Sequence, residues 1–192
     1  MARHSTEQRI YEESEYLLNA LRQLNGVPTD VSHVLMNAVS NIMCSMVFGR
    51  RFDYDDKDFK DLLLSNHMVM TKLQASALLT FIPILWYAPM PFKRELRHHF
   101  EKIIDYAKRE ISKFRHSTKN EPLPESFISA YIRREDEYRK SKSEGKESVQ
   151  HFLEDPEHLQ WTVVNLFTAG THTTAISLSW VLLFLCLNQD VQ

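Results

Sequence analysis

The residues best suited to chemistry lie in the segment Phe167–Thr174, where small residues are followed by hydroxyl and imidazole groups. Glycine and β-branched threonine are poor helix formers, so local propensity does not explain their presence inside a helical pattern. The hydroxyl of Thr173 can bond the carbonyl of Ala169, four residues back, which bends a helix and can open a small polar groove. Because Ala169 and Gly170 add little bulk, a flat ligand or a diatomic molecule could approach the backbone there. The alternative is a kinked helix that only packs against other helices.

Other candidate residues carry less specific signals. His172 could donate or accept a proton near neutral pH, although a lone helical histidine is more often structural. Glu95 and His98 have the spacing of a di-iron ligand pair, but such a site needs a second Glu-x-x-His, which the sequence lacks. The basic residues between Lys93 and Arg109 alternate with acidic ones, which is typical of a solvated helix face. Phosphate-binding glycine loops and H-E-x-x-H or G-x-S-x-G motifs are also absent from the sequence.

The elements that must position these residues are helices. The chain has 192 residues, of which 43% are apolar, 25% are charged and only four are glycine. This is the composition of a globular protein, and no sustained two-residue alternation indicates β-strands. The net charge of −2 provides no overall basic field, so we expect no nucleic-acid partner. The predicted fold class is all-α.

Helical periodicity and capping residues predict six helices, at residues 6–25, 31–48, 60–79, 92–115, 124–136 and 156–189. The second is apolar over so much of its surface that we expect it to be deeply buried. We expect the last to be a buried central helix that packs against the second, because polar side chains in its middle argue against a membrane span. The charged segment 133–147 predicts a solvated helix end and a loop that form no core.

The hexapeptide Ala169–Thr174 resembles the oxygen-binding signature of cytochrome P-450 monooxygenases, Ala/Gly-Gly-x-Asp/Glu-Thr-Thr/Ser, at every defined position except the acid, which is His172 here. The stretch Asn41–Tyr54 is similar to the corresponding helix and turn of the animal microsomal members, and Phe127-Ile128 precedes the same kind of charged loop. The resemblance covers nearly the whole chain, from the family's helix D through its helix I. It implies an incomplete cytochrome P-450 fold.

Motifs that the family carries elsewhere are missing. Neither Cys44 nor Cys186 has the glycines of Phe-x-x-Gly-x-x-x-Cys-x-Gly, the loop whose cysteine ligates the haem iron. The family's Glu-x-x-Arg and Trp-x-x-x-Arg are absent as well. We therefore expect residues 1–192 to be a partial cytochrome P-450 domain whose flanks, including the cysteine loop, lie outside the chain, and we expect the chain alone to be inactive.

The resemblance also implies roles for individual residues. Haem is the expected cofactor, with Ala169, Gly170 and Thr173 beside it and no metal ligand within this chain. Asn165 and Ala169 are expected on the substrate side. The expected catalytic residues are Thr173, which would hold water and help to deliver protons to bound O2, and His172. The imidazole of His172 either replaces the family's acid as a proton relay or marks a slowed or redirected reaction.

At the level of the whole protein, the resemblance implies a monooxygenase that inserts one atom of O2 into a small lipophilic substrate, using NADPH-derived electrons delivered by NADPH-cytochrome reductase. The apolar, proline-interrupted segment 81–92 falls where a loop of this family dips into the membrane. We therefore expect the full-length protein at the cytoplasmic face of the endoplasmic reticulum membrane. The alternative is a truncated, inactive helical protein that uses residues 81–92 to bind a partner or a membrane.

Overall fold

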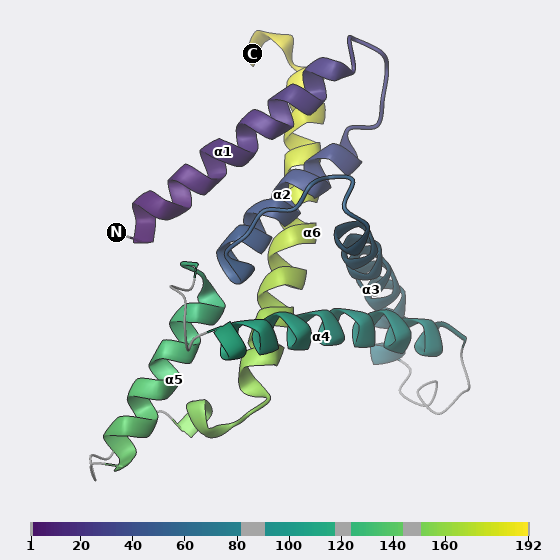
Figure 1. The fold of residues 1–192 in the computed structure, drawn as a ribbon. Coiled ribbons are helices and arrows are strands. Elements are labelled where there is room, and N and C mark those ends of the chain that lie inside the picture. Colours follow the sequence, from purple (N-terminus) through teal and green to yellow (C-terminus); the bar gives the residue numbers. More distant parts are fainter. Residues whose placement is uncertain (1, 82–90, 118–123, 144–150, 192) are drawn as a thin grey trace.

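The computed structural model describes residues 2–81, 91–117, 124–143 and 151–191 (Figure 1). Within these ranges the chain is all-α and contains no strand, which confirms the predicted fold class. The helices are α1 (Ala2–Gln23), α2 (Ser32–Phe48), α3 (Lys57–Phe81), α4 (Pro91–Ser117), α5 (Phe127–Ser143) and α6 (His158–Leu187), with short 3-10 helices η2 (His151–Glu154) and η3 (Gln189–Val191). Most of the apolar segment 81–92 lies outside the described residues.

All six predicted helices are present, and the largest difference is at the end of α5, which continues to Ser143. The prediction that no core forms within 133–147 was wrong for the described part, because Glu135 and Tyr138 are buried. Glu135 binds Arg115 of α4 at 2.9 Å, and the hydroxyl of Tyr138 donates a hydrogen bond to Glu154 at 2.6 Å. A charged segment can join a core where other elements supply partners, and those partners come from distant positions in the sequence.

α6 runs through the centre of the molecule, and α2 is the helix that packs most extensively against it (Figure 1). This confirms the predicted pairing of the second and last helices. α1 covers the other side of α2, while α4 contacts both α3 and α6. Burial of large apolar side chains from several helices holds this arrangement together. The fully buried ones are Val47, Phe59, Val69, Ile103, Ile128, Leu159, Val163, Val164 and Phe167.

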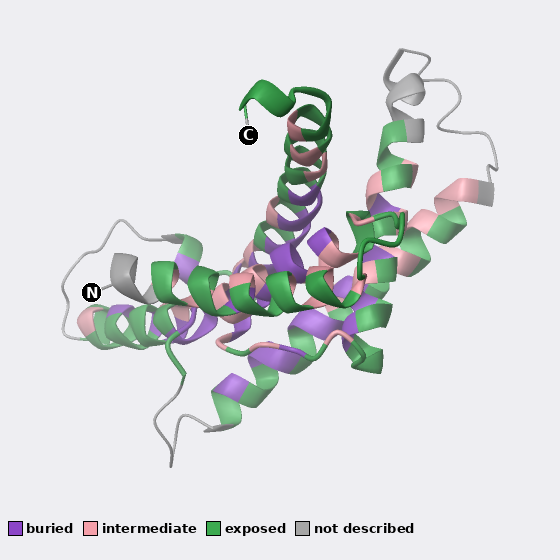
Figure 2. Cartoon of the chain, turned by 90° about the horizontal axis from the view of Figure 1, so that it is seen from above, coloured by how far each residue is buried: buried purple, intermediate pink, exposed green. Residues whose placement is uncertain are grey.

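The prediction that α6 is a buried helix is correct for one face and wrong for the other. Its C-terminal half exposes Val181, Phe184 and Leu187, because no described element covers them (Figure 2). By length and composition alone α6 could cross a membrane. Its contacts with α2, α3, α4 and α5 give the apolar residues of the buried face partners within the chain.

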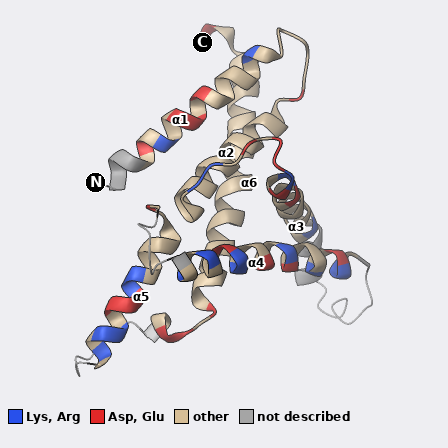
Figure 3. Cartoon of the chain, viewed as in Figure 1, with Lys and Arg blue, Asp and Glu red and all other residues tan. Residues whose placement is uncertain are grey.

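Charged side chains are distributed unevenly over the helices. α4 and α5 carry lysine, arginine, aspartate and glutamate along much of their length, whereas α6 has none of these residues (Figure 3). The expected solvated face of α4 is present, with one buried exception: Glu110 accepts hydrogen bonds from Arg50 at 2.9 Å and from Lys113 at 2.7 Å. The absence of charged residues on α6 suits a helix that packs against four others at the centre of the molecule.

Candidate functional site

Asn165, Ala169 and Thr173 form an exposed strip along one face of α6, since they are four residues apart. The hydroxyl of Thr173 donates a hydrogen bond to the carbonyl oxygen of Ala169 at 2.6 Å, as the spacing predicts. Exposed apolar side chains, including Ile176 and Trp180, continue the same face toward the C-terminus. The structure therefore brings three of the five predicted site residues onto one accessible surface, which we call the α6 strip.

Gly170 points away from the α6 strip and toward α2. A Cβ atom at this position would lie 2.7 Å from Cε and 2.8 Å from Sδ of Met43. Glycine therefore lets α6 approach the Met43 side chain closely, which gives a structural reason for a residue that is otherwise unfavourable inside a helix. Its role beside a cofactor stays a prediction.

His172 lies at the edge between the buried and the exposed faces of α6, and its side chain is buried. Its ring faces His67 of α3, with 5.9 Å between the ring centroids and an angle of 41° between the planes. Burial, and secondarily the charge of His67, lower the pKa of His172 below the ordinary histidine value. His172 is therefore neutral at pH 7, with one ring nitrogen able to donate a hydrogen bond and the other able to accept one.

Three buried oxygen atoms near these residues in the sequence have no hydrogen-bond partner among the described residues. They are Oγ1 of Thr168, Oγ1 of Thr171 and Oδ1 of Asn66. Buried polar atoms in proteins normally have a partner, and where the protein supplies none the usual partner is an ordered water molecule. Sequence reasoning did not single out these atoms, because only the crossing of the helices determines which hydroxyls are buried.

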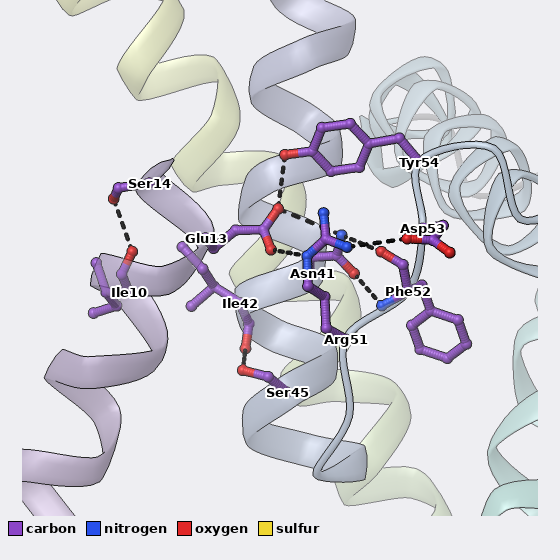
Figure 4. Close-up of polar contacts among 10 residues, drawn as sticks. All are labelled: Ile10, Glu13, Ser14, Asn41, Ile42, Ser45, Arg51, Phe52, Asp53 and Tyr54. Carbon is purple, nitrogen blue, oxygen red and sulfur yellow. Dashed lines mark hydrogen bonds and ion pairs between the residues drawn. The ribbon is translucent and has the colours of Figure 1, made fainter. Parts of the chain in front are cut away.

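A buried carboxylate, Glu13 of α1, organises the turn that follows α2 (Figure 4). It accepts hydrogen bonds from Arg51 at 2.8 Å, from the hydroxyl of Tyr54 at 2.7 Å and from the amide of Asn41 at 3.4 Å. Asn41 also donates to the carbonyl oxygen of Phe52 and accepts from its amide, at 2.8 and 2.9 Å. These contacts fix α1 to α2 and explain why Asn41, Arg51 and Tyr54 belong together in one stretch of sequence.

Two apolar cavities meet at the N-terminal end of α2, where both are lined by Ser32 and Met36. The larger, of about 420 Å³, lies between α2 and α3 and is lined by Ser32, His33, Met36, Asn37, Lys60, Leu63, Leu64 and His67. The smaller, of about 220 Å³, lies between α2 and α6 and includes Ala175, Ile176 and Trp180. We call the larger cavity the α2–α3 groove. A third cavity, between α3 and α4, is lined mainly by charged residues.

The residues predicted to lie beside the haem are compatible with one wall of such a site, and neither cysteine is suited to ligate its iron. The small side chains of the α6 strip leave room for a flat group, and α6 carries no charge that would oppose an apolar one. Cys44 is fully buried, and this burial raises the pKa of its thiol well above the usual range, so it does not supply a thiolate. Cys186 is exposed on the last turns of α6, outside any glycine-containing loop.

The di-iron alternative finds no support in the described residues, which contain no cluster of three metal-ligating side chains. Glu95 instead forms an ion pair with Lys72 of α3 at 2.6 Å. The His98 ring contacts its neighbour His99, with 5.4 Å between the centroids. Glu95 and His98 of α4 therefore make contacts at the surface of the protein.

The comparisons with known proteins identify the family. A family model described as Cytochrome P450 matches residues 1–192. Cytochrome P450 2U1 of Homo sapiens is 36% identical over 191 residues, which cover 98% of this chain and 34% of that protein. Cytochrome P450 2H2 of Gallus gallus is 34% identical over 195 residues, covering 100% of this chain and 37% of that protein. Cytochrome P450 2J2 of Homo sapiens is 35% identical over 196 residues, with the same coverage.

The chain thus spans about a third of the length of the curated relatives it matches. The match extends over the whole sequence and includes both the α6 strip with the hexapeptide Ala169–Thr174 and the stretch around Asn41. The predicted family relationship is confirmed: the chain belongs to the cytochrome P450 family.

Proposed function

We propose that residues 1–192 form the central helical part of an enzyme that inserts one oxygen atom of O2 into a small lipophilic substrate. The family is one of haem monooxygenases, and the electrons would come from NADPH through NADPH-cytochrome reductase. The single observation that carries the proposal is the α6 strip, an exposed small-residue surface on an uncharged helix with the Thr173 hydroxyl bonded to the Ala169 carbonyl. The iron ligand and the opposite wall of the site would lie in segments outside these residues.

When bound, the haem supplies the redox chemistry that activates O2. Thr173 contributes a fixed hydroxyl. The hydroxyl donates its proton to the carbonyl oxygen of Ala169, with 2.6 Å between the two oxygen atoms. The lone pairs of the hydroxyl oxygen therefore remain free to accept hydrogen bonds from water. A water molecule held in this way is a proton donor next to the small-residue surface. Because the side chain of Ala169 is only a methyl group, it leaves space beside the Thr173 hydroxyl.

Asn165 and the apolar residues of the exposed face would contact the substrate. Asn165 lies one turn before Ala169 and offers an amide with two donors and one acceptor. Ile176 and Trp180 extend the same face with apolar area. A surface with few polar groups among many apolar ones favours a lipophilic substrate with limited hydrogen-bonding capacity.

We place the protein at the cytoplasmic face of the endoplasmic reticulum membrane, with the segment 81–92 in contact with the lipid. The composition of that segment supports this: prolines separate large apolar side chains such as Trp86 and Tyr87. The test is binding to phosphatidylcholine vesicles by flotation. We expect the variant Trp86→Ser, Tyr87→Ser to bind less than the parent, and equal binding of the two would contradict the assignment.

A carbon monoxide difference spectrum of the reduced protein tests the proposed function. It is recorded for residues 1–192 alone and for the complete natural chain that contains them. We expect a thiolate-type band for the complete chain and none for residues 1–192, because the thiol of Cys44 is buried and Cys186 lies outside a haem-binding loop. A complete chain without the band would favour the inactive helical protein, and a band from residues 1–192 would show that one of these cysteines ligates the iron.

A further inference from the structure

His67 of α3 and His172 of α6 meet where the two helices contact each other. The ring centroids are 5.9 Å apart, a separation that a single bridging water molecule can span. The two side chains differ in environment: His67 is exposed and His172 is buried. The pair therefore joins a solvent-accessible imidazole to one inside the molecule.

His67, the exposed histidine of the pair, lies beside a cavity. His67 lines the α2–α3 groove, a cavity of about 420 Å³ that also includes Ser32, His33 and Asn37. These polar groups line the groove together with apolar side chains, so the groove can hold water that reaches His67. At the other end of the pair, His172 directly precedes Thr173 of the α6 strip.

Unpartnered oxygen atoms adjoin both histidines in the sequence. Thr171 is next to His172, Thr168 is one turn earlier on α6, and Asn66 is next to His67. All three have a buried side-chain oxygen without a partner among the described residues. Such atoms are the ordinary sites of buried water in proteins.

The electrostatic surroundings of His172 involve few other groups. α2 contributes no lysine, arginine or carboxylate, and its titratable residues are His33 and Cys44. Among the described residues, His67 is the one whose charge acts on His172. Burial first, and the charge of His67 second, lower the pKa of His172.

We propose that His67 is a positioning residue for the oxygen chemistry: it receives protons from the α2–α3 groove and passes them to His172, which delivers them toward Thr173. In each passage an imidazole takes up a proton at one ring nitrogen and releases the proton of the other, so it returns to its neutral form and no electrons move. This inference rests on the proposed function, because it assigns the protons a use at the α6 strip. It adds His67 of α3, which is exposed to solvent, as a partner of the predicted relay residue His172.

The test compares His67→Gln, which removes the charge, with His67→Lys, which keeps it. His33→Gln is the matched control, because His33 lines the same groove and has no ring contact with His172. The first measurement is the NMR titration of His172 in the complete chain labelled with 15N-histidine. We expect the midpoint to rise in His67→Gln and to stay low in His67→Lys and in His33→Gln. Equal midpoints in all four proteins would overturn the coupling of the pair.

The second measurement is the peroxide formed per NADPH consumed, as a function of pH. We expect His67→Gln to release severalfold more peroxide than the parent, with NADPH use little changed, and His33→Gln to behave as the parent. Unchanged peroxide release in His67→Gln would overturn the proton route even if the titrations are coupled. A complete chain without a thiolate-type carbon monoxide band would instead refute the proposed function, and the titration would still report whether the histidines are coupled.

Discussion

Replacing Glu13 by alanine tests whether this buried carboxylate holds α1 against the rest of the molecule. Its side chain is 4% exposed, and that of Arg51 is 26% exposed. The substitution removes the acceptor for Arg51 at 2.8 Å and for Tyr54 at 2.7 Å. The guanidinium of Arg51, whose centre lies 3.5 Å from the centroid of the Tyr16 ring, then keeps this aromatic contact and its exposed ion pair with Asp53 at 3.3 Å, but loses its buried counter-ion.

The expected loss of stability follows from these contacts. Removing one partner of a buried ion pair costs about 3–5 kcal/mol, and a hydrogen bond to a charged group contributes about 1.5–3 kcal/mol. Because Arg51 is partly exposed, water can replace some of what it loses. We therefore expect Glu13→Ala to lower the free energy of unfolding by about 3 kcal/mol, a large part of the stability of an ordinary domain.

The assay is urea unfolding followed by far-UV circular dichroism, with Glu15→Ala as the control because Glu15 is exposed on the same helix. A double-mutant cycle with Arg51→Ala isolates the pair, and we expect a coupling energy of about 2 kcal/mol. A loss below about 1 kcal/mol, or one equal to that of Glu15→Ala, would refute this reasoning.

Three further predictions concern other parts of the structure. Gly170→Leu should lower the free energy of unfolding in urea by about 2 kcal/mol, because the leucine side chain would collide with Met43. Adding Met43→Ala to this variant should restore part of the lost stability. A double variant no more stable than Gly170→Leu would contradict this contact. His172→Gln should reduce the loss of stability on acidification: the folded chain holds the pKa of His172 low, so the unfolded chain binds the proton first and stability falls below about pH 6.5. Urea midpoints at about pH 7.5 and about pH 5.5 check this, and an equal acid dependence of parent and variant would refute it. Trp180→Glu should decrease binding of the dye ANS by residues 1–192, because Trp180 belongs to the exposed apolar face of α6. The free energy of unfolding should change by less than about 0.5 kcal/mol, since the side chain is exposed. Unchanged dye binding would show that ANS does not bind to this face of α6.

Local patterns in the sequence predicted the helices well, because the apolar period of a helix and its capping residues lie within a few residues of each other. The hydrogen bond from Thr173 to Ala169 was predictable for the same reason, since it joins residues one turn apart. The exposed face shared by Asn165, Ala169 and Thr173 also follows from helical spacing.

Contacts between distant elements were not predictable in this way. The orientation of Gly170 toward Met43 depends on how α2 and α6 cross. The contact between His67 and His172 joins residues more than one hundred positions apart, and nothing near either histidine in the sequence indicates the other. The carboxylate of Glu13 lies among several charged residues of α1 that look alike in the sequence, and only the fold distinguishes it as the buried one.

The measurement that tests the central claim most directly is the peroxide released per NADPH by the complete chain with Thr173→Ala. Thr162→Ala is the matched control, because its hydroxyl makes the same kind of bond on the same helix, to the carbonyl oxygen of His158 at 2.8 Å, about three turns before Thr173. If Thr173 holds the water that supplies protons, Thr173→Ala should raise peroxide release toward one molecule per NADPH while NADPH use continues, and Thr162→Ala should behave as the parent. Equal peroxide release by Thr173→Ala and the parent would contradict the assignment of the α6 strip to oxygen activation.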